Sequence, residues 1–161
     1  MTKRIHLIAA VLATLTIATF FLSTVLVELF GSPEAVAGVK RLIVIPGLLL
    51  LVPAIAATGG SGFALSKSRR GVLVEAKKKR MSFIAGNGLL ILIPCAIFLD
   101  LWASKGVFDI RFYLVQALEL LAGGTNLVLM GLNMRDGLRL TGRLRFNQPL
   151  NSDAPPELRA G

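Results

Sequence analysis

Four long segments of this sequence carry almost no charged side chains, and this leaves few folds open to the chain. No Asp, Glu, Lys or Arg lies in 5–27, 42–66 or 81–99. The fourth segment, 112–134, contains Glu119 as its one charged residue. A helix needs about 20 residues to cross a hydrocarbon core of about 30 Å. Each segment is therefore about as long as a membrane-spanning helix.

The residue pattern inside these segments favours helices over strands. Residues 48–52 and 89–93 are continuously apolar, whereas a membrane β-strand alternates apolar and polar side chains. Hydrophobic residues make up 54% of the chain, above the roughly 45–50% of a soluble protein. In lipid, the backbone N–H and C=O groups must hydrogen-bond to each other, which only helices and closed β-barrels achieve. Since the pattern disfavours strands, helices are the remaining structure. We predict an all-α integral membrane four-helix bundle, with helices at about 5–29, 41–65, 81–103 and 110–135.

The bundle is expected to form one domain over 1–146. Residues 147–161 lack apolar periodicity and include Pro155 and Pro156, so we predict a mobile cytoplasmic tail. Proline removes a helical hydrogen bond and clashes with the preceding turn. We therefore expect bends near Pro53 and Pro94.

The basic residues predict the orientation. With both termini in the cytoplasm, the inner side holds fourteen Lys and Arg and the outer side four. Basic residues concentrate on the cytoplasmic side of membrane proteins. We therefore expect a multi-pass protein of the bacterial inner (plasma) membrane, N-in and C-in. Anionic lipid headgroups are the expected partner of its inner basic residues, namely Lys77, Lys78, Lys79, Arg80, Arg135 and Arg139.

The basic clusters and the first apolar segment each admit a second, less favoured interpretation. The net charge of +9 suggests nucleic acid, but the basic clusters lack the interleaved aromatics that stack on bases, so no nucleic-acid partner is expected. Residues 35–37 have the Ala-x-Ala form of a signal-peptide cleavage site. The apolar segment before them is longer than the usual 7–15 residues of a signal peptide, so we expect it to be retained.

Glu119 is the most informative residue, because it lies well inside the fourth predicted helix. An ionised group facing lipid there would cost at least about 2.5–3.5 kcal/mol. Its side chain should therefore face the interior of the bundle. Spacings of three and four residues place a stripe of polar and small side chains on the same helical face: Gln116, Glu119, Gly123, Asn126, Met130 and Asn133.

Residues on other helices at matching depth are the expected partners of this stripe. Counting inward from the helix ends puts Thr19 and Ser23 at the depth of Glu119, so either hydroxyl is predicted to bond to its carboxylate. The same reasoning pairs Asn87 with Asn126. The candidate polar site is thus Glu119, Gln116, Asn126, Asn87, Ser23 and Thr19.

No residue pattern points to catalysis, a metal or a cofactor. The chain has one histidine, His6, which rules out bis-histidine haem within one chain, and one cysteine, Cys95. A nucleophile with a base and an orienting group is not found in a credible arrangement. We expect a protein that is not an enzyme and binds no cofactor.

The opening Lys3-Arg4-Ile5-His6-Leu7, followed by a helix rich in small residues, resembles uncharacterised four-helix bacterial membrane proteins of copper-resistance-D-like layout. The resemblance implies the four-helix architecture, while the lack of further histidines argues against a copper or haem role. The chain is also similar to small multidrug exporters, which have four short helices and one membrane carboxylate. Their carboxylate lies in the first helix, whereas Glu119 lies in the fourth.

Two functions remain open. The first is an accessory, assembly or scaffold subunit of a membrane complex, because the polar stripe suits contacts between helices. The second is a small proton-coupled transporter acting through Glu119, since intramembrane acids often serve transport. A membrane-protein partner or a homodimer is the expected protein contact.

Overall fold

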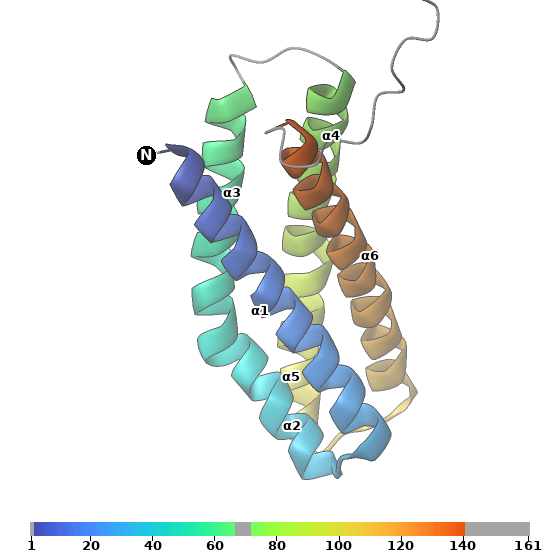
Figure 1. The fold of residues 1–161 in the computed structure, drawn as a ribbon. Coiled ribbons are helices and arrows are strands. Elements are labelled where there is room, and N and C mark those ends of the chain that lie inside the picture. Colours follow the sequence, from blue (N-terminus) through green and yellow to red (C-terminus); the bar gives the residue numbers. More distant parts are fainter. Residues whose placement is uncertain (1, 67–71, 141–161) are drawn as a thin grey trace, which may run out of the picture.

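The computed structural model describes residues 2–66 and 72–140, with side chains omitted at a few positions near the ends of these ranges. The predicted tail 147–161 and residues 67–71 of the basic loop lie outside the described residues. All regular structure in the described ranges is helical (Figure 1). The elements are α1 (Thr2–Phe30), α2 (Pro33–Leu42), η1 (Ile43–Gly47), α3 (Leu48–Ser66), α4 (Val72–Asn87), η2 (Gly88–Leu92), α5 (Ile93–Ala103) and α6 (Ile110–Leu140).

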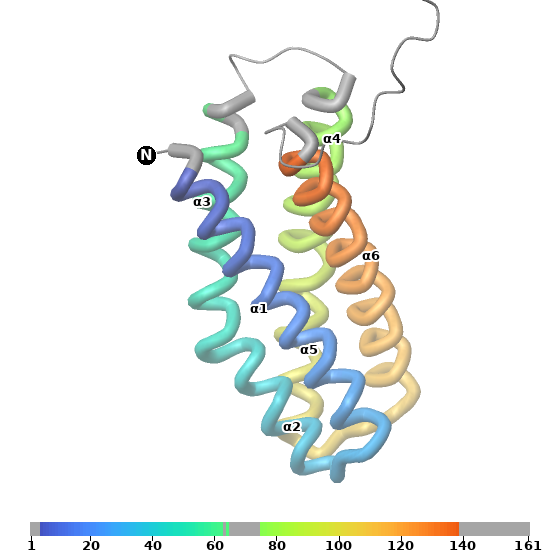
Figure 2. The backbone as a smooth tube through the Cα atoms, viewed as in Figure 1, coloured from blue at the N-terminus to red at the C-terminus, as the bar shows by residue number. Residues whose placement is uncertain are grey.

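These elements form four rods, because α2, η1 and α3 run on as one and α4, η2 and α5 as another (Figure 2). The start of α1, the end of α3, the start of α4 and the end of α6 lie at one end of the bundle. This end also carries the described part of the basic loop, whereas the turn from α1 to α2 and the turn from α5 to α6 lie at the opposite end. We call the two ends the basic end and the turn end.

The second rod begins earlier than the predicted residue 41. Ser32 caps α2 by accepting a hydrogen bond from the Ala35 amide at 3.3 Å, and Pro33 occupies the first turn. Serine at the cap and proline just inside the helix are both favoured start residues. The earlier start places Lys40 inside a helix instead of in the preceding turn.

Both composite rods are interrupted by π-helical turns. In η1, Ile45 leaves helical geometry with φ −134° and ψ 110°, directly before Pro46. The interruption is thus at Pro46, and α3 runs through Pro53, where a bend was expected. In the third rod, the π-helical turn η2 ends at Leu92, two residues before Pro94, near which a bend was expected. A wider turn can accommodate a proline ring and its missing donor.

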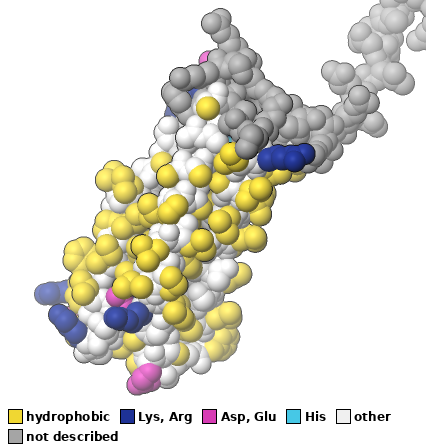
Figure 3. Space-filling model, turned by 90° about the vertical axis from the view of Figure 1, so that its left-hand side faces the viewer, with side chains coloured by type: hydrophobic (Ala, Val, Ile, Leu, Met, Phe, Trp, Pro, Cys, Tyr) yellow, Lys and Arg dark blue, Asp and Glu magenta, His cyan; other side chains and the backbone are white. Residues whose placement is uncertain are grey.

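Four helical segments of the described chain are long and apolar enough to cross a membrane: Arg4–Phe30, Pro33–Gly62, Glu75–Ala103 and Ile110–Leu138. Large apolar side chains cover much of the outer surface, and the visible Lys and Arg side chains lie toward its ends (Figure 3). Leu49, Leu90 and Leu121 are each more than 70% exposed. Such a surface is unfavourable in water but suits the hydrocarbon of a bilayer.

Two apolar clusters hold the rods together. Toward the basic end, α1, α3, α4 and α6 meet through Ala13, Ile17, Leu51, Ala54, Ile84 and Met130. Toward the turn end, α2, α5 and α6 meet through Val36, Leu99, Ala103 and Phe112. Small side chains in α1 allow close approach of its neighbour α3, as expected for helices that pack by shape in lipid.

Candidate functional site

The polar face of α6 points into the bundle, as the spacing of its residues predicted. Gln116, Glu119, Asn126 and Asn133 are each less than a tenth exposed, although they lie in a segment that can cross a membrane. Most buried polar groups in proteins are hydrogen-bonded, because an unmatched one costs about 1–3 kcal/mol. Their partners therefore decide what this face of α6 does.

Glu119 is paired with a lysine from the second rod. Lys40 Nζ lies 2.5 Å from Glu119 Oε2, and Lys40 is completely buried. Gln116, one turn earlier on α6, donates its Nε2–H to the same oxygen at 3.2 Å. The carboxylate thus joins α2 to α6 near the turn end. In a medium of low dielectric, such a pair is retained because each charge compensates the other.

The predicted partners of Glu119 were wrong. The Thr19 hydroxyl donates to the Leu15 carbonyl at 2.9 Å, and the Ser23 hydroxyl donates to the Phe20 carbonyl at 3.1 Å. Both hydroxyls are satisfied within their own helix, a common arrangement for Ser and Thr. Lys40 was missed because it adjoins Arg41 and was assigned to the turn outside the span. The helix-start signal in Ser32 and Pro33 would have placed it one turn or more inside α2.

The predicted pair of asparagines is confirmed. Asn87 Nδ2 donates to Asn126 Oδ1 at 2.8 Å and also to the Ala122 carbonyl at 2.9 Å. In return, Asn126 Nδ2 donates to the Ile84 carbonyl at 3.4 Å. These contacts tie α4 to α6 near the middle of the bundle, where Asn126 is completely buried.

A third polar contact lies at the basic end and was not predicted. Arg80 Nη1 donates to Asp136 Oδ2 at 2.7 Å and reaches Asn133 Oδ1 at 3.5 Å. Arg135 Nε is 3.4 Å from the other Asp136 oxygen, and the Asp136 side chain is only 1% exposed. Asp136 lies one turn beyond Asn133, so extending the stripe by three residues would have found it.

The basic residues expected at lipid headgroups therefore differ in their surroundings. Arg80 and Arg135 bind Asp136, whereas Lys78 and Lys79 are exposed on α4 and Lys77 is partly buried. The side chain of Arg139 lies outside the described residues. Contact of this group with lipid stays a prediction.

The turn end also holds buried acceptors that lack a donor. Glu28 Oε1, Asp100 Oδ1 and Gln116 Oε1 are buried with no hydrogen-bond partner among the described residues. Glu28 is also close enough to Lys40 and Glu119 to interact with their charges. Two of these acceptors, on Glu28 and Gln116, thus lie near the ion pair.

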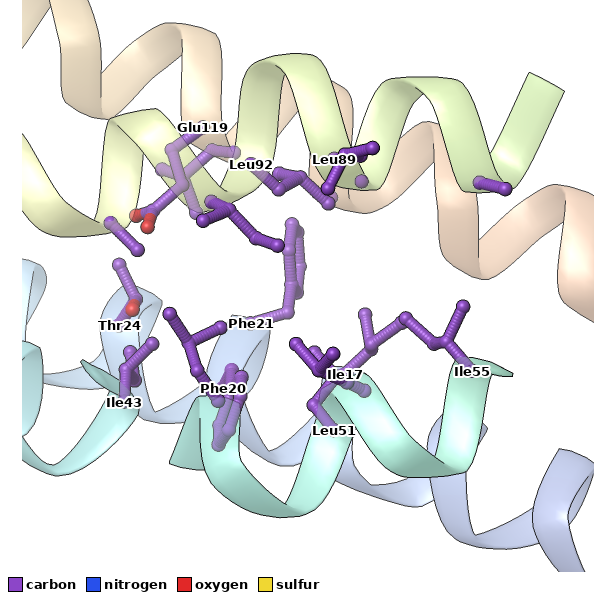
Figure 4. A pocket seen from close by; sticks show the side chains of 18 of the residues that line it. Ile17, Phe20, Phe21, Thr24, Ile43, Leu51, Ile55, Leu89, Leu92 and Glu119 are labelled. Atoms are coloured by element: carbon purple, nitrogen blue, oxygen red, sulfur yellow. The ribbon is translucent and has the colours of Figure 1, made fainter. Parts of the chain in front are cut away.

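A cavity of about 250 Å³ adjoins the ion pair, between α1 and α3 on one side and the third rod and α6 on the other (Figure 4). Side chains of Phe20, Phe21, Leu51 and Leu92 contribute to its apolar walls. Two of its lining residues have polar side chains, Thr24 and Glu119, and both lie toward the same end.

Within the described part of the chain, no group of three or more His, Cys, Asp or Glu side chains is placed to hold a metal ion. His6 lies at the basic end, where its Nδ1 is 3.1 Å from the Ser61 hydroxyl.

The chain matches no protein-family model, and comparisons with curated proteins and with solved structures found no match either.

Removing only the lysine of the ion pair should destabilise the bundle more than removing both the lysine and the glutamate. Lys40→Met leaves Glu119 as an uncompensated buried acid, so we expect the free energy of unfolding in detergent micelles to fall by about 3–5 kcal/mol. The double variant Lys40→Met/Glu119→Leu should recover a large part of that loss. Arg41→Met, at the exposed neighbouring position, is the matched control. Strictly additive losses in this double-mutant cycle would show that the two side chains are not coupled.

Removing the central amide should weaken the contact between α4 and α6. We expect Asn126→Leu to lower the unfolding free energy by about 0.6–2 kcal/mol for each hydrogen bond lost. Denaturant titration in the same micelles measures the change. Thr125→Val serves as the control, because the Thr125 hydroxyl is exposed and bonds within its own helix to the Leu121 carbonyl. Equal effects of the two substitutions would contradict the assigned role of Asn126.

Proposed function

We propose that the protein is a non-enzymatic accessory, assembly or scaffold subunit of a membrane complex, located in the bacterial inner membrane. The observation that carries this proposal is the use of the polar side chains of α6. Along this helix, Glu119, Asn126 and Asp136 are each engaged with a residue of another rod, namely Lys40, Asn87 and Arg80. These polar side chains are already engaged in contacts between helices, which favours a structural role over a catalytic or transport role.

The apolar outer surface supports the membrane location, and the basic end supports the orientation. Arg4, Lys78, Lys79 and Arg135 lie toward the end at which α1 starts and α6 ends. Basic residues concentrate on the cytoplasmic side of membrane proteins. In the proposed orientation this end, with both termini, therefore faces the cytoplasm. Anionic headgroups then lie beside exposed Lys78 and Lys79. Apolar side chains elsewhere are available to lipid, to a partner subunit or to a second copy.

A proton-coupled transporter acting through Glu119 is the second candidate, and the cavity beside this residue is the observation in its favour. The ion pair weighs against it. If Glu119 took up a proton in a transport cycle, Lys40 would remain charged and fully buried without its counter-ion, which is costly in a medium of low dielectric. The structural role requires no such step.

The orientation can be tested with single cysteines in a Cys95→Ala background. Lys79→Cys should react with a membrane-impermeant maleimide in inside-out vesicles and stay unlabelled in spheroplasts. Lys105→Cys, on the exposed turn before α6, should show the opposite pattern. Labelling of position 79 from outside the cell would overturn the proposed orientation.

The function can be tested by deleting the chain in its native host and measuring the abundance of membrane complexes. We expect one complex to lose assembly or abundance several-fold, to contain this chain when crosslinked in native membranes, and to recover with the wild-type chain. The double variant Lys40→Met/Glu119→Leu, which removes both buried charges, should restore assembly, whereas Glu119→Gln leaves Lys40 without its counter-ion and should accumulate less. If no complex changes and vesicles show proton-driven uptake that Glu119→Gln abolishes, the transporter replaces the subunit as the function.

A further inference from the structure

The cavity beside Glu119 has features that the structural role of the bundle does not need. Its volume is about 250 Å³, whereas an apolar cavity of about 150 Å³ in another protein is large enough to bind benzene. Close packing between helices would normally fill such a space. A space of this size inside a helical bundle, with polar atoms at one end, has the form of a small-molecule site.

The side chains that line the cavity favour a ligand that is largely apolar. Most lining side chains come from Ile, Leu, Val, Ala and Phe, and Phe20 and Phe21 place two rings against the space. The lining residues belong to all four rods, so an occupant would contact each of them. Burial of apolar surface against such walls is the main source of affinity for a lipid-soluble molecule.

The polar end offers hydrogen-bonding capacity that the protein does not use. Glu119 Oε2 accepts from both Lys40 and Gln116, but no donor from the described residues reaches Oε1. Thr24 is 2% exposed, and its hydroxyl has no hydrogen-bond partner in the described part of the chain. By contrast, Thr16 and Thr19 on the same helix bond to the carbonyl four residues back. Thr24 and Glu119 therefore present one hydroxyl and one acceptor oxygen at the same end of the cavity (Figure 4).

The charges at this end favour a neutral occupant. Lys40 already compensates the charge of Glu119, and an added cation would compete with a lysine that is fully buried. An anion would be repelled by Glu119 and by nearby Glu28. A hydroxyl group is neutral, donates one hydrogen bond and accepts another, so it complements both Glu119 Oε1 and the Thr24 hydroxyl.

Access to the cavity is from the side of the bundle. Val52 on α3 and Leu89 on η2 both line the cavity, yet they are 46% and 65% exposed on the outer surface. Ala56 and Ala85 also belong to the lining and are exposed. The space therefore reaches the apolar surface between the second and third rods, where a molecule dissolved in hydrocarbon can enter without passing through water.

We propose that this cavity binds one neutral amphipathic alcohol, whose apolar ring or chain fills the space and whose hydroxyl donates to Glu119 Oε1 and accepts from Thr24. The proposal goes beyond the subunit role and does not depend on it. The occupant is drawn from the membrane, either as the hydroxyl-bearing part of a lipid or as a small lipid-soluble alcohol.

A photoreactive benzyl alcohol carrying a diazirine tests the proposal, with its methyl ether as the matched probe that has no donor. In detergent-solubilised wild-type protein, the alcohol should label cavity residues saturably and the ether about tenfold less at equal mole fraction in the micelle. Thr24→Val, which is nearly isosteric and removes the donor to the ligand oxygen, should weaken saturable labelling by the alcohol several-fold without changing the thermal midpoint, while the alcohol stays preferred over the ether because Glu119 is still present. Equal labelling by alcohol and ether would overturn the proposal, because it would reflect apolar partitioning alone.

Filling the cavity provides a second, independent arm. A Cβ at Gly123 would meet Phe21 and Leu92 side chains at 3.6 and 3.9 Å, which is ordinary contact, so Gly123→Leu should occupy the space and abolish saturable labelling. Gly131→Leu, at an exposed position with open space around it, controls for the change in helix composition. Unchanged labelling in a folded Gly123→Leu variant would also overturn the assignment.

Mass spectrometry of organic extracts distinguishes the two sources. A hydroxyl-bearing lipid that co-purifies with wild type in near-equal amount and is lost from Gly123→Leu would support the proposal and assign the lipid source. Saturable labelling without such a lipid would support it with a diffusible alcohol as occupant.

Discussion

Charged and amide groups withdrawn from water must find their partners within the protein, and this requirement organises the bundle around α6. Glu119 meets Lys40, Asn126 meets Asn87, and Asp136 meets Arg80. Lipid tails are as apolar as the helix surfaces, so they give helices little reason to associate. The polar contacts, together with close packing of small residues, supply that reason and fix which face of α6 points inward.

The polar contacts are unevenly distributed over the bundle. They join α6 to the second and third rods. The cavity reaches the outer surface between the second and third rods, through Val52 and Leu89. The polar contacts of α6 and the opening of the cavity thus lie in different parts of one fold, so the proposed structural role and the proposed ligand site do not compete for the same atoms.

The sequence predicted much of this architecture, because lipid imposes simple rules. Long uncharged segments indicated four helices, and the helical repeat indicated the inward face of α6 and the pairing of Asn87 with Asn126. The partner of Glu119 was missed, since a lysine next to an arginine looked like a membrane flank. The interruption of the helix at Pro46 and the presence of the cavity could not be predicted from the sequence either. Both depend on how side chains from several rods fill space, which residue spacing along one helix does not determine.

The long separation between Lys40 and Glu119 has a consequence for how the chain enters a membrane. The two residues are 79 positions apart, so at a synthesis rate of about 5–20 residues per second the carboxylate emerges about 4–16 s after the lysine. Until then the lysine has no counter-charge and its long side chain can reach toward the headgroups. In a membrane, the second span would therefore gain its counter-charge only when α6 packs against it.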